Sequence, residues 1–252
     1  DRRAGVICNE LRRLAVKQRK KIDGWEYKKG FFIHPEDVKD DLTEFESFDS
    51  DRMYWYGPDE HYWFRCELTV PEEFDNKPLW LHISTAIEGW AGGDPQFLLF
   101  VDKNPLQGVD SNHNDILLSR AAISGKTYLL ELQAYSGRPY GELKMIAEAR
   151  EIDPEITGLY YDMKVPLEAF PRLEKDGKPR RDLERVLNHA VNLLDLRTPY
   201  SEDFYDSVHK ARKYLDQALY TDLAGSDEVI ATCIGHTHID VAWLWTVAQT
   251  QE

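Results

Sequence analysis

Cysteine is scarce in this chain. Its three residues, Cys8, Cys66 and Cys233, stand far apart among 252, and their odd number without a Cys-x-x-Cys pair excludes a disulfide framework or a zinc ribbon. Long apolar runs are missing too, since no stretch approaches the roughly 20 residues that span a bilayer. No apolar leader is recognisable near the first residues either. These absences predict a protein of the reducing, cytoplasmic compartment with no membrane partner.

Basic residues are also in short supply. The formal net charge is -14, although residues 1–21 hold eight Arg and Lys against two acidic residues. The remainder of the chain is therefore even more acidic than the total indicates. Because contacts to phosphate groups need a basic face, nucleic acid is excluded as a partner for the body of the chain.

The basic segment at the start has a helical pattern. Within residues 5–22, Ile7, Leu11 and Leu14 recur near helical spacing, and Arg and Lys fill much of the remaining surface. The pattern predicts one amphipathic helix in an N-terminal segment of residues 1–24. A solvated face accounts for its charge, with a membrane surface or an acidic partner as the alternative.

Large apolar side chains, in contrast, are plentiful, with 42% hydrophobic and 12% aromatic residues. From residue 25 to about residue 150, short alternating runs are separated by Gly, Pro, Asn and Asp, as in antiparallel β proteins. The turn residues 102–105 predict a hairpin. We expect a β-sandwich or jelly roll over residues 25–152, with strands near 62–70, 78–85, 96–102, 127–135 and 141–151.

The pattern becomes helical after about Asp153. Residues 181–196 carry apolar residues at i, i+3, i+4 and i+7, and Ser201 opens a second helix with acidic residues in its first turn. Residues 153–226 are therefore predicted to form a helical connector. The acidic segment 36–51 does not have the spacing of a calcium-binding EF-hand loop, and a solvated loop is the favoured interpretation.

Residues 227–252 hold the segment with the clearest chemistry. Val229–Ile234 is short, apolar and β-branched, as expected of a buried parallel strand. Side chains two apart share a face of a strand, so His236, His238 and Asp240 can point the same way from its carboxyl end. Two imidazoles and a carboxylate form a partial set of zinc ligands. A metal-free acid or base role and a structural cluster are the alternatives.

Two stretches resemble a known family. The string GHTHIDVAWLW (235–245) resembles the first strand and ligand motif of the glycoside hydrolase family 38 α-mannosidases. The string FLLFVDKNPLQGVDSNHNDILL (97–118) resembles an element of the β domain that precedes the barrel in their bacterial and cytosolic branch. It departs from that pattern at Lys103, where Gly is usual, and at Asp115, where Glu is usual.

The resemblance implies site residues and a reaction. By position, His238 and Asp240 would coordinate zinc and Trp243 would line the subsite of the mannose being cleaved, whereas His236 matches no ligand. The implied reaction is a retaining displacement that removes terminal α-linked mannose from oligosaccharides. We expect the nucleophile, the acid and the remaining zinc ligands to lie beyond Glu252, so the 252 residues alone should be inactive.

The resemblance also implies an architecture. Residues 25–152 would be a galactose-binding-like jelly roll and residues 153–226 the helical connector. Residues 227–252 would begin a seven-stranded α/β barrel. A homo-oligomer is compatible with the sequence.

Two alternatives remain at this point. A metal-dependent amidohydrolase also carries a His-x-His at its first barrel strand, but usually without a Trp three residues after an Asp. A carbohydrate-binding module without catalysis would use exposed aromatic side chains. The candidates for such stacking are Tyr54, Trp55, Tyr56, Tyr62 and Trp63, although alternating core aromatics explain most of this cluster.

Overall fold

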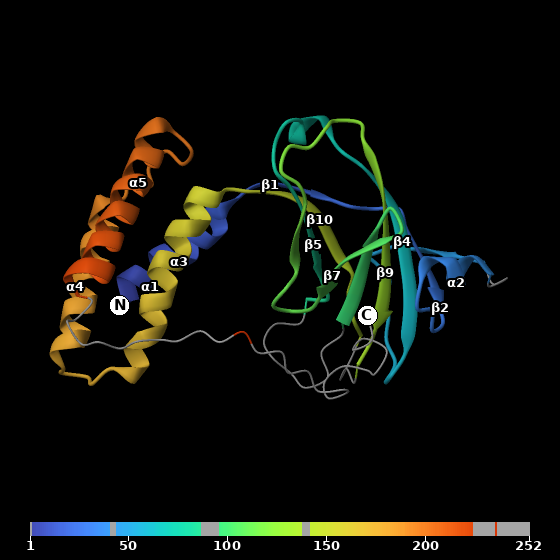
Figure 1. Ribbon diagram of the computed structural model, residues 1–252, viewed down its shortest axis with the longest axis horizontal. Coiled ribbons are helices and arrows are strands. Elements are labelled where there is room, and N and C mark those ends of the chain that lie inside the picture. The colour runs from blue at the N-terminus through green and yellow to red at the C-terminus, as the bar shows by residue number, and fades with distance from the viewer. Residues whose placement is uncertain (1, 41–43, 87–95, 138–141, 224–234, 236–252) are drawn as a thin grey trace. The chain divides into compact units, whose positions relative to one another are not determined.

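The computed structural model describes residues 2–40, 44–86, 96–137, 142–223 and 235. Internal contacts divide the chain into two units. Within the described residues, a helical unit combines residues 2–17 with 152–223, and a β unit lies between them in the sequence (Figure 1). No helix in these ranges is long and apolar enough to cross a membrane.

The helical unit is built around four helices. The first and the last of them each pack on the second and the third. A 3-10 turn, Phe170–Arg172, extends the second helix, and a π-helical turn, Gln217–Asp222, follows the last one. The four helices are α1 (Arg2–Ala15), α3 (Pro154–Ala169), α4 (Lys178–Leu193) and α5 (Glu202–Asp216).

Side-chain caps fix where two of these helices begin. The Ser201 hydroxyl accepts a hydrogen bond from the Phe204 amide at the start of α5, as the sequence predicts. At α3, the Asp153 carboxylate accepts from the amides of Glu155 and Ile156. Pro154 follows in the first helical position, where its missing N–H costs nothing.

The N-terminal helix is shorter than the sequence predicts. α1 ends at Ala15, and the next residues form the strand β1 (Val16–Lys21). The Lys and Arg side chains of this segment suit a helix, but Ile22 donates its amide to Ala147 and buries its side chain in the β core. Tertiary pairing therefore overrides a modest helical propensity.

The β unit contains two antiparallel sheets. The four-stranded sheet has the order β1-β10-β5-β8, and the six-stranded sheet has the order β3-β2-β4-β9-β6-β7. A short helix, α2 (Pro35–Asp40), lies between β2 and β3 in the sequence. The remaining strands are β2 (Trp25–Lys29), β3 (Glu46–Phe48), β4 (His61–Thr69), β5 (Leu79–Ser84), β6 (Gln96–Val101), β7 (Asn104–Val109), β8 (Asp115–Ser119), β9 (Thr127–Tyr135) and β10 (Ile146–Ile152).

One apolar core joins the inner faces of the two sheets. Phe64 and Leu132 from the six-stranded sheet share a buried cluster with Leu81 and Ala149 from the four-stranded sheet. Along β4, β5 and β9 every second residue contributes, which is the alternation that the sequence shows. The expectation of a sandwich of antiparallel sheets is confirmed at this level, and Figure 1 shows β5 and β10 in one layer with β4 and β9 in the other.

The predicted hairpin joins β6 to β7. Its two central residues, Asp102 and Lys103, have φ angles of 51° and 69°. Positive φ at both positions defines the mirror-image turn that suits the twist of a two-residue hairpin. Lys103 thus adopts a left-handed conformation that glycine takes at much lower cost.

We predict that the helical unit depends on the buried face of α5. Val208 is 0% exposed, and Val208→Ala should lower the free energy of unfolding by about 2 kcal/mol because it deletes two buried carbons and leaves a cavity. Val165 on α3 is 62% exposed, so Val165→Ala should change it by less than about 0.5 kcal/mol. Urea unfolding followed by circular dichroism measures both. Equal losses would contradict this packing.

Candidate functional site

The zinc and mannose residues predicted from the sequence, His238, Asp240 and Trp243, lie outside the described residues, as does His236. Their assignment therefore stays a prediction. In the part of the chain that the structure describes, no three His, Cys, Asp or Glu side chains are grouped to hold a metal ion. The described residues nevertheless form other polar clusters, on the outer faces of both sheets.

The second motif, residues 97–118, forms the β6-β7 hairpin and its continuation into β8. The Asp102 carboxylate accepts a hydrogen bond from the Leu129 amide and so ties the turn to β9. Asp110 accepts from the amides of Asn112 and His113 and contacts the His113 ring at 2.9 Å. The motif's polar residues thus shape turns.

Asp115, at the end of this motif, belongs to an ion cluster on the outer face of the four-stranded sheet. It lies 2.8 Å from His82 Nδ1 and 3.2 Å from Arg150 Nη1, and Arg150 also contacts Glu148. Burial raises the pKa of Asp115, but the hydrogen bonds and charges of His82 and Arg150 outweigh this, so its pKa falls below the ordinary value. The cluster links three neighbouring strands.

The aromatic cluster considered for sugar stacking is largely core. Trp55, Tyr62 and Trp63 are buried, whereas Tyr54 and Tyr56 are exposed. The Tyr62 hydroxyl donates to the Tyr56 carbonyl, and the Trp55 indole packs on the Tyr62 ring at 5.5 Å between centroids. The expectation that core packing explains most of this cluster is therefore confirmed.

A row of charged residues crosses the outer face of the six-stranded sheet. Strand register places Glu26 of β2 opposite Arg65 of β4, and Arg65 opposite Glu131 of β9. Arg65 donates to Glu26 Oε2 from both Nε and Nη2 at 2.8 Å. The guanidinium group is therefore committed to Glu26 and not to the carboxylate on its other side.

A cap, formed by residues 31–40 and Phe45, covers part of this face. Phe32 and Val38 pack with Trp63 and Phe100 in a small apolar cluster. Gln133, which is buried, donates its amide to the Phe32 carbonyl at 2.6 Å. Buried polar groups of the sheet thus hydrogen-bond the cap's backbone, as buried polar groups require.

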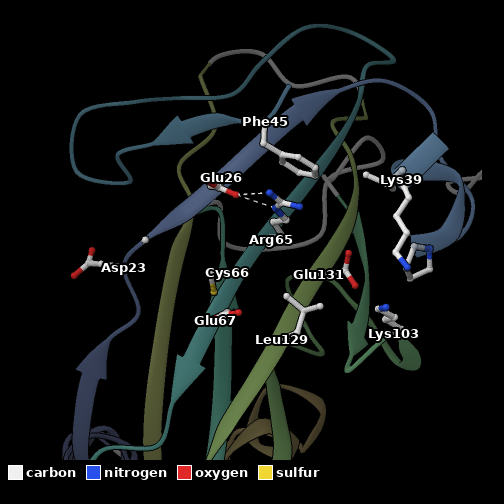
Figure 2. Close-up of a pocket in the computed structure, with 13 residues that line it drawn as sticks. Asp23, Glu26, Lys39, Phe45, Arg65, Cys66, Glu67, Lys103, Leu129 and Glu131 are labelled. Atoms are coloured by element: carbon white, nitrogen blue, oxygen red, sulfur yellow. Dashed lines mark hydrogen bonds and ion pairs between the residues drawn. The ribbon is translucent and has the colours of Figure 1, made fainter. Parts of the chain in front are cut away.

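Beside the cap lies a hollow of about 640 Å³ (Figure 2). Such a volume is within the range of small-molecule sites, about 300–1,000 Å³. The Phe45 ring lies over the Arg65 guanidinium at 3.6 Å, and this stack forms one side of the hollow. The lining residues are Asp23, Gly24, Glu26, Pro35, Val38, Lys39, Phe45, Arg65, Cys66, Glu67, Lys103, Leu129 and Glu131.

Glu131 is the unusual member of this lining. It is only 6% exposed, and its Oε1 accepts a long hydrogen bond of 3.3 Å from the Trp63 indole. Its Oε2 is buried and has no hydrogen-bond partner among the described residues. Burial raises the pKa of Glu131, although the Trp63 indole and the charges of Lys103 and Arg65 oppose this effect.

The amino-acid sequence alone does not predict this hollow. The strand TYLLELQAY carries one signal of it. Glu131 and Gln133 are two residues apart, and apolar residues lie on either side of each. That pattern predicts a polar outer face, but it cannot show which polar groups of other strands lie beside them.

Comparison with known proteins gives relatives for much of the chain. No family model matches. The chain is 24% identical over 210 residues to alpha-mannosidase 2C1 of Mus musculus, covering 75% of this chain and 18% of that protein. It is 23% identical over 254 residues to alpha-mannosidase G of Dictyostelium discoideum, covering 94% and 21%. The chain is thus distantly similar to α-mannosidases and spans about a fifth of their length.

Solved structures give a weaker likeness. A β-glucuronidase from Ruminococcus gnavus in complex with D-glucuronic acid has a TM-score of 0.35 at 12% identity, over 53% of this chain and 29% of its own. The Bacteroides uniformis β-glucuronidase has a TM-score of 0.36 at 14% identity, over 52% and 18%. Both scores are low, and no functional inference follows from them.

Glu131 should make stability depend on pH. Its folded-state pKa lies above the unfolded one, so its contribution to stability falls as pH rises from about 4.5 through the folded pKa. Glu131→Gln has no titrating group at this position and so avoids the loss. As pH rises, the free energy of unfolding of Glu131→Gln should increase relative to that of the unmodified chain.

Urea unfolding at several pH values measures the difference. Glu67→Gln, a change of the same kind at an exposed lining residue on β4, is the matched control. Parallel curves for Glu131→Gln and the unmodified chain would contradict the assignment.

Proposed function

We propose that this chain is the N-terminal part of a zinc-dependent retaining α-mannosidase that hydrolyses terminal α-linked mannose in oligosaccharides. The observation that carries the proposal is the sequence similarity to two α-mannosidases, which with the second of them extends over 94% of the chain. The motif GHTHIDVAWLW adds to this support, because it places zinc-binding residue types two apart, with a tryptophan three residues after the second of them.

The donor set fits the proposed metal. Zinc accepts imidazole nitrogen and carboxylate oxygen at about 2.0 to 2.2 Å, and His238 and Asp240 supply one of each. Catalytic zinc sites usually use three protein ligands, so the set is partial. When bound, zinc would supply a positive charge that orients the sugar's 2- and 3-hydroxyls.

The roles of the chain's own residues follow from their chemistry. His238 would bind through neutral imidazole and Asp240 through its carboxylate, which requires both to be deprotonated. Trp243 would present an apolar ring to the C–H face of the mannose and so exclude water from one side of it. The attacking carboxylate and the acid of a retaining mechanism would come from segments outside these 252 residues.

We further propose the finer architecture. The two antiparallel sheets would be a galactose-binding-like jelly roll, and residues 227–252 would open the catalytic barrel. The amidohydrolase alternative has less support, since both sequence relatives are named as α-mannosidases.

The proposal predicts loss of activity at the two ligands. In the intact enzyme, His238→Ala and Asp240→Ala should each lower the release of p-nitrophenol from p-nitrophenyl α-mannoside by about 1,000-fold or more, because zinc supplies several kcal/mol of transition-state stabilisation. The zinc content, measured by atomic absorption, should fall together with the activity, because each change removes a metal ligand. Exposed His209 on α5 is the matched control, and His209→Ala should keep activity and zinc. Normal turnover in both ligand variants would refute the assignment.

Trp243 gives a second expected outcome. Trp243→Ala should retain zinc but lower kcat/KM for the same mannoside by about 10- to 100-fold, because it removes an apolar contact to the sugar and misplaces it. Loss of zinc in this variant would instead assign Trp243 a structural role.

Turnover of amides or esters without glycosidase activity would support the amidohydrolase alternative.

A further inference from the structure

We infer that the hollow on the outer face of the six-stranded sheet binds an uncharged sugar, through Glu131, Arg65 and Lys103. The inference concerns binding alone and does not rest on the proposed hydrolase activity. It starts from an imbalance in the hollow: Glu131 Oε2 is buried without a hydrogen-bond partner among the described residues. A buried polar atom without a partner costs free energy that a ligand's hydrogen bond would recover.

The register explains why none of the described side chains hydrogen-bonds this oxygen. The cross-strand neighbour, Arg65, turns its guanidinium to Glu26 and stacks under Phe45. The Trp63 indole reaches the other oxygen, Oε1, at 3.3 Å. Figure 2 shows the Glu131 carboxyl group among the lining side chains, with Arg65 on one side and Lys39 and Lys103 on the other.

The charges of the lining decide the chemical class of the ligand. Four carboxylate residues and three cationic residues line the hollow. An anion would be repelled by the carboxylates, and a cation would compete with the lysines and Arg65. A hydroxyl group suits both sets, because one oxygen donates to a carboxylate and accepts from an ammonium or guanidinium group. Several such groups on one rigid ring describe a sugar, whose carbon atoms could contact Leu129.

The Lys103 side chain adds a donor to the hollow from a neighbouring turn. Lys103 lies in the β6-β7 turn with a φ of 69°, and its side chain lines the hollow. Its charge acts on the Glu131 carboxyl group and lowers the pKa of that group, against the effect of burial. A hydroxyl group of a ligand in the hollow could therefore accept from Lys103 and donate to Glu131.

The test is a titration of the 252-residue chain with methyl glycosides of mannose, glucose, galactose and xylose up to 50 mM, followed by backbone amide NMR signals. We expect at least one glycoside to shift the signals of residues 65, 103 and 131 with a dissociation constant on the order of 1 mM. Methyl glucuronide and sulfate are the anionic probes. No shift with any glycoside, or tighter binding of either anion, would overturn the inference.

Variants locate the site. Glu131→Leu should weaken glycoside binding at least tenfold, because it removes the buried carboxylate that faces the hollow. The change also removes the acceptor of the Trp63 indole, so the unfolding midpoint is measured beside the affinity. Glu131→Gln keeps a hydrogen-bonding side chain and should weaken binding no more than threefold. Unchanged affinity in Glu131→Leu would place the sugar elsewhere and overturn the inference.

A turn variant keeps the test decisive if Glu131→Leu fails to fold. Lys103→Gly should raise the unfolding midpoint, because glycine relieves the positive φ, and weaken glycoside binding at least threefold. Its matched control is Asn76→Gly, which relieves a φ of 55° at a residue that does not line the hollow. That variant should keep its affinity unchanged. Equal affinity in Lys103→Gly and Asn76→Gly would count against the site.

Discussion

The antiparallel pairing of β4 with β9 fixes the chemistry of both faces of the six-stranded sheet. The two strands pair along nine residues from His61↔Tyr135 to Thr69↔Thr127. In this register Phe64 faces the core with Leu132, while Arg65 faces outward beside Glu131. A slip of one residue would exchange the faces, burying charges in the sandwich core. The core, the outer row of charges and the hollow therefore all depend on this ladder.

The outer face combines burial with polarity, and the cap is what makes this combination stable. Gln133 satisfies its amide on the cap backbone, and the Lys28 ammonium lies 3.5 Å from the Val38 carbonyl and 5.0 Å from the Phe45 ring centroid. These contacts stabilise polar side chains that water does not reach. Glu131 differs because one of its oxygens is left without such a contact among the described residues. The neighbouring buried polar groups are hydrogen-bonded, so this one oxygen atom lowers the stability of the fold locally. Such exceptions are expected at functional sites.

Local patterns predicted much of the fold, and tertiary pairing decided the rest. Alternation identified β4 and β9, and helical spacing with a Ser201 cap identified α5, because each signal lies within one segment. The sequence pattern predicts a helix through residues 16–21, which form a strand instead because their partner, β10, is remote in sequence. The hollow could not be predicted for the same reason. Its lining residues come from several strands, and only the strand register brings them together. The zinc residues are predicted from a motif alone.

The order of elements along the chain has a consequence for how the protein is made. α1 packs on α3, yet roughly 140 residues, the entire β unit, separate Ala15 from Pro154. A ribosome adding about 5–20 residues per second leaves α1 without its bundle partners for on the order of ten seconds. During that interval Leu11 and Leu14, both buried in the finished bundle, have no bundle core to enter. The buried face of α1 therefore has to wait for α3 and α4, whereas its basic side chains can stay in water throughout.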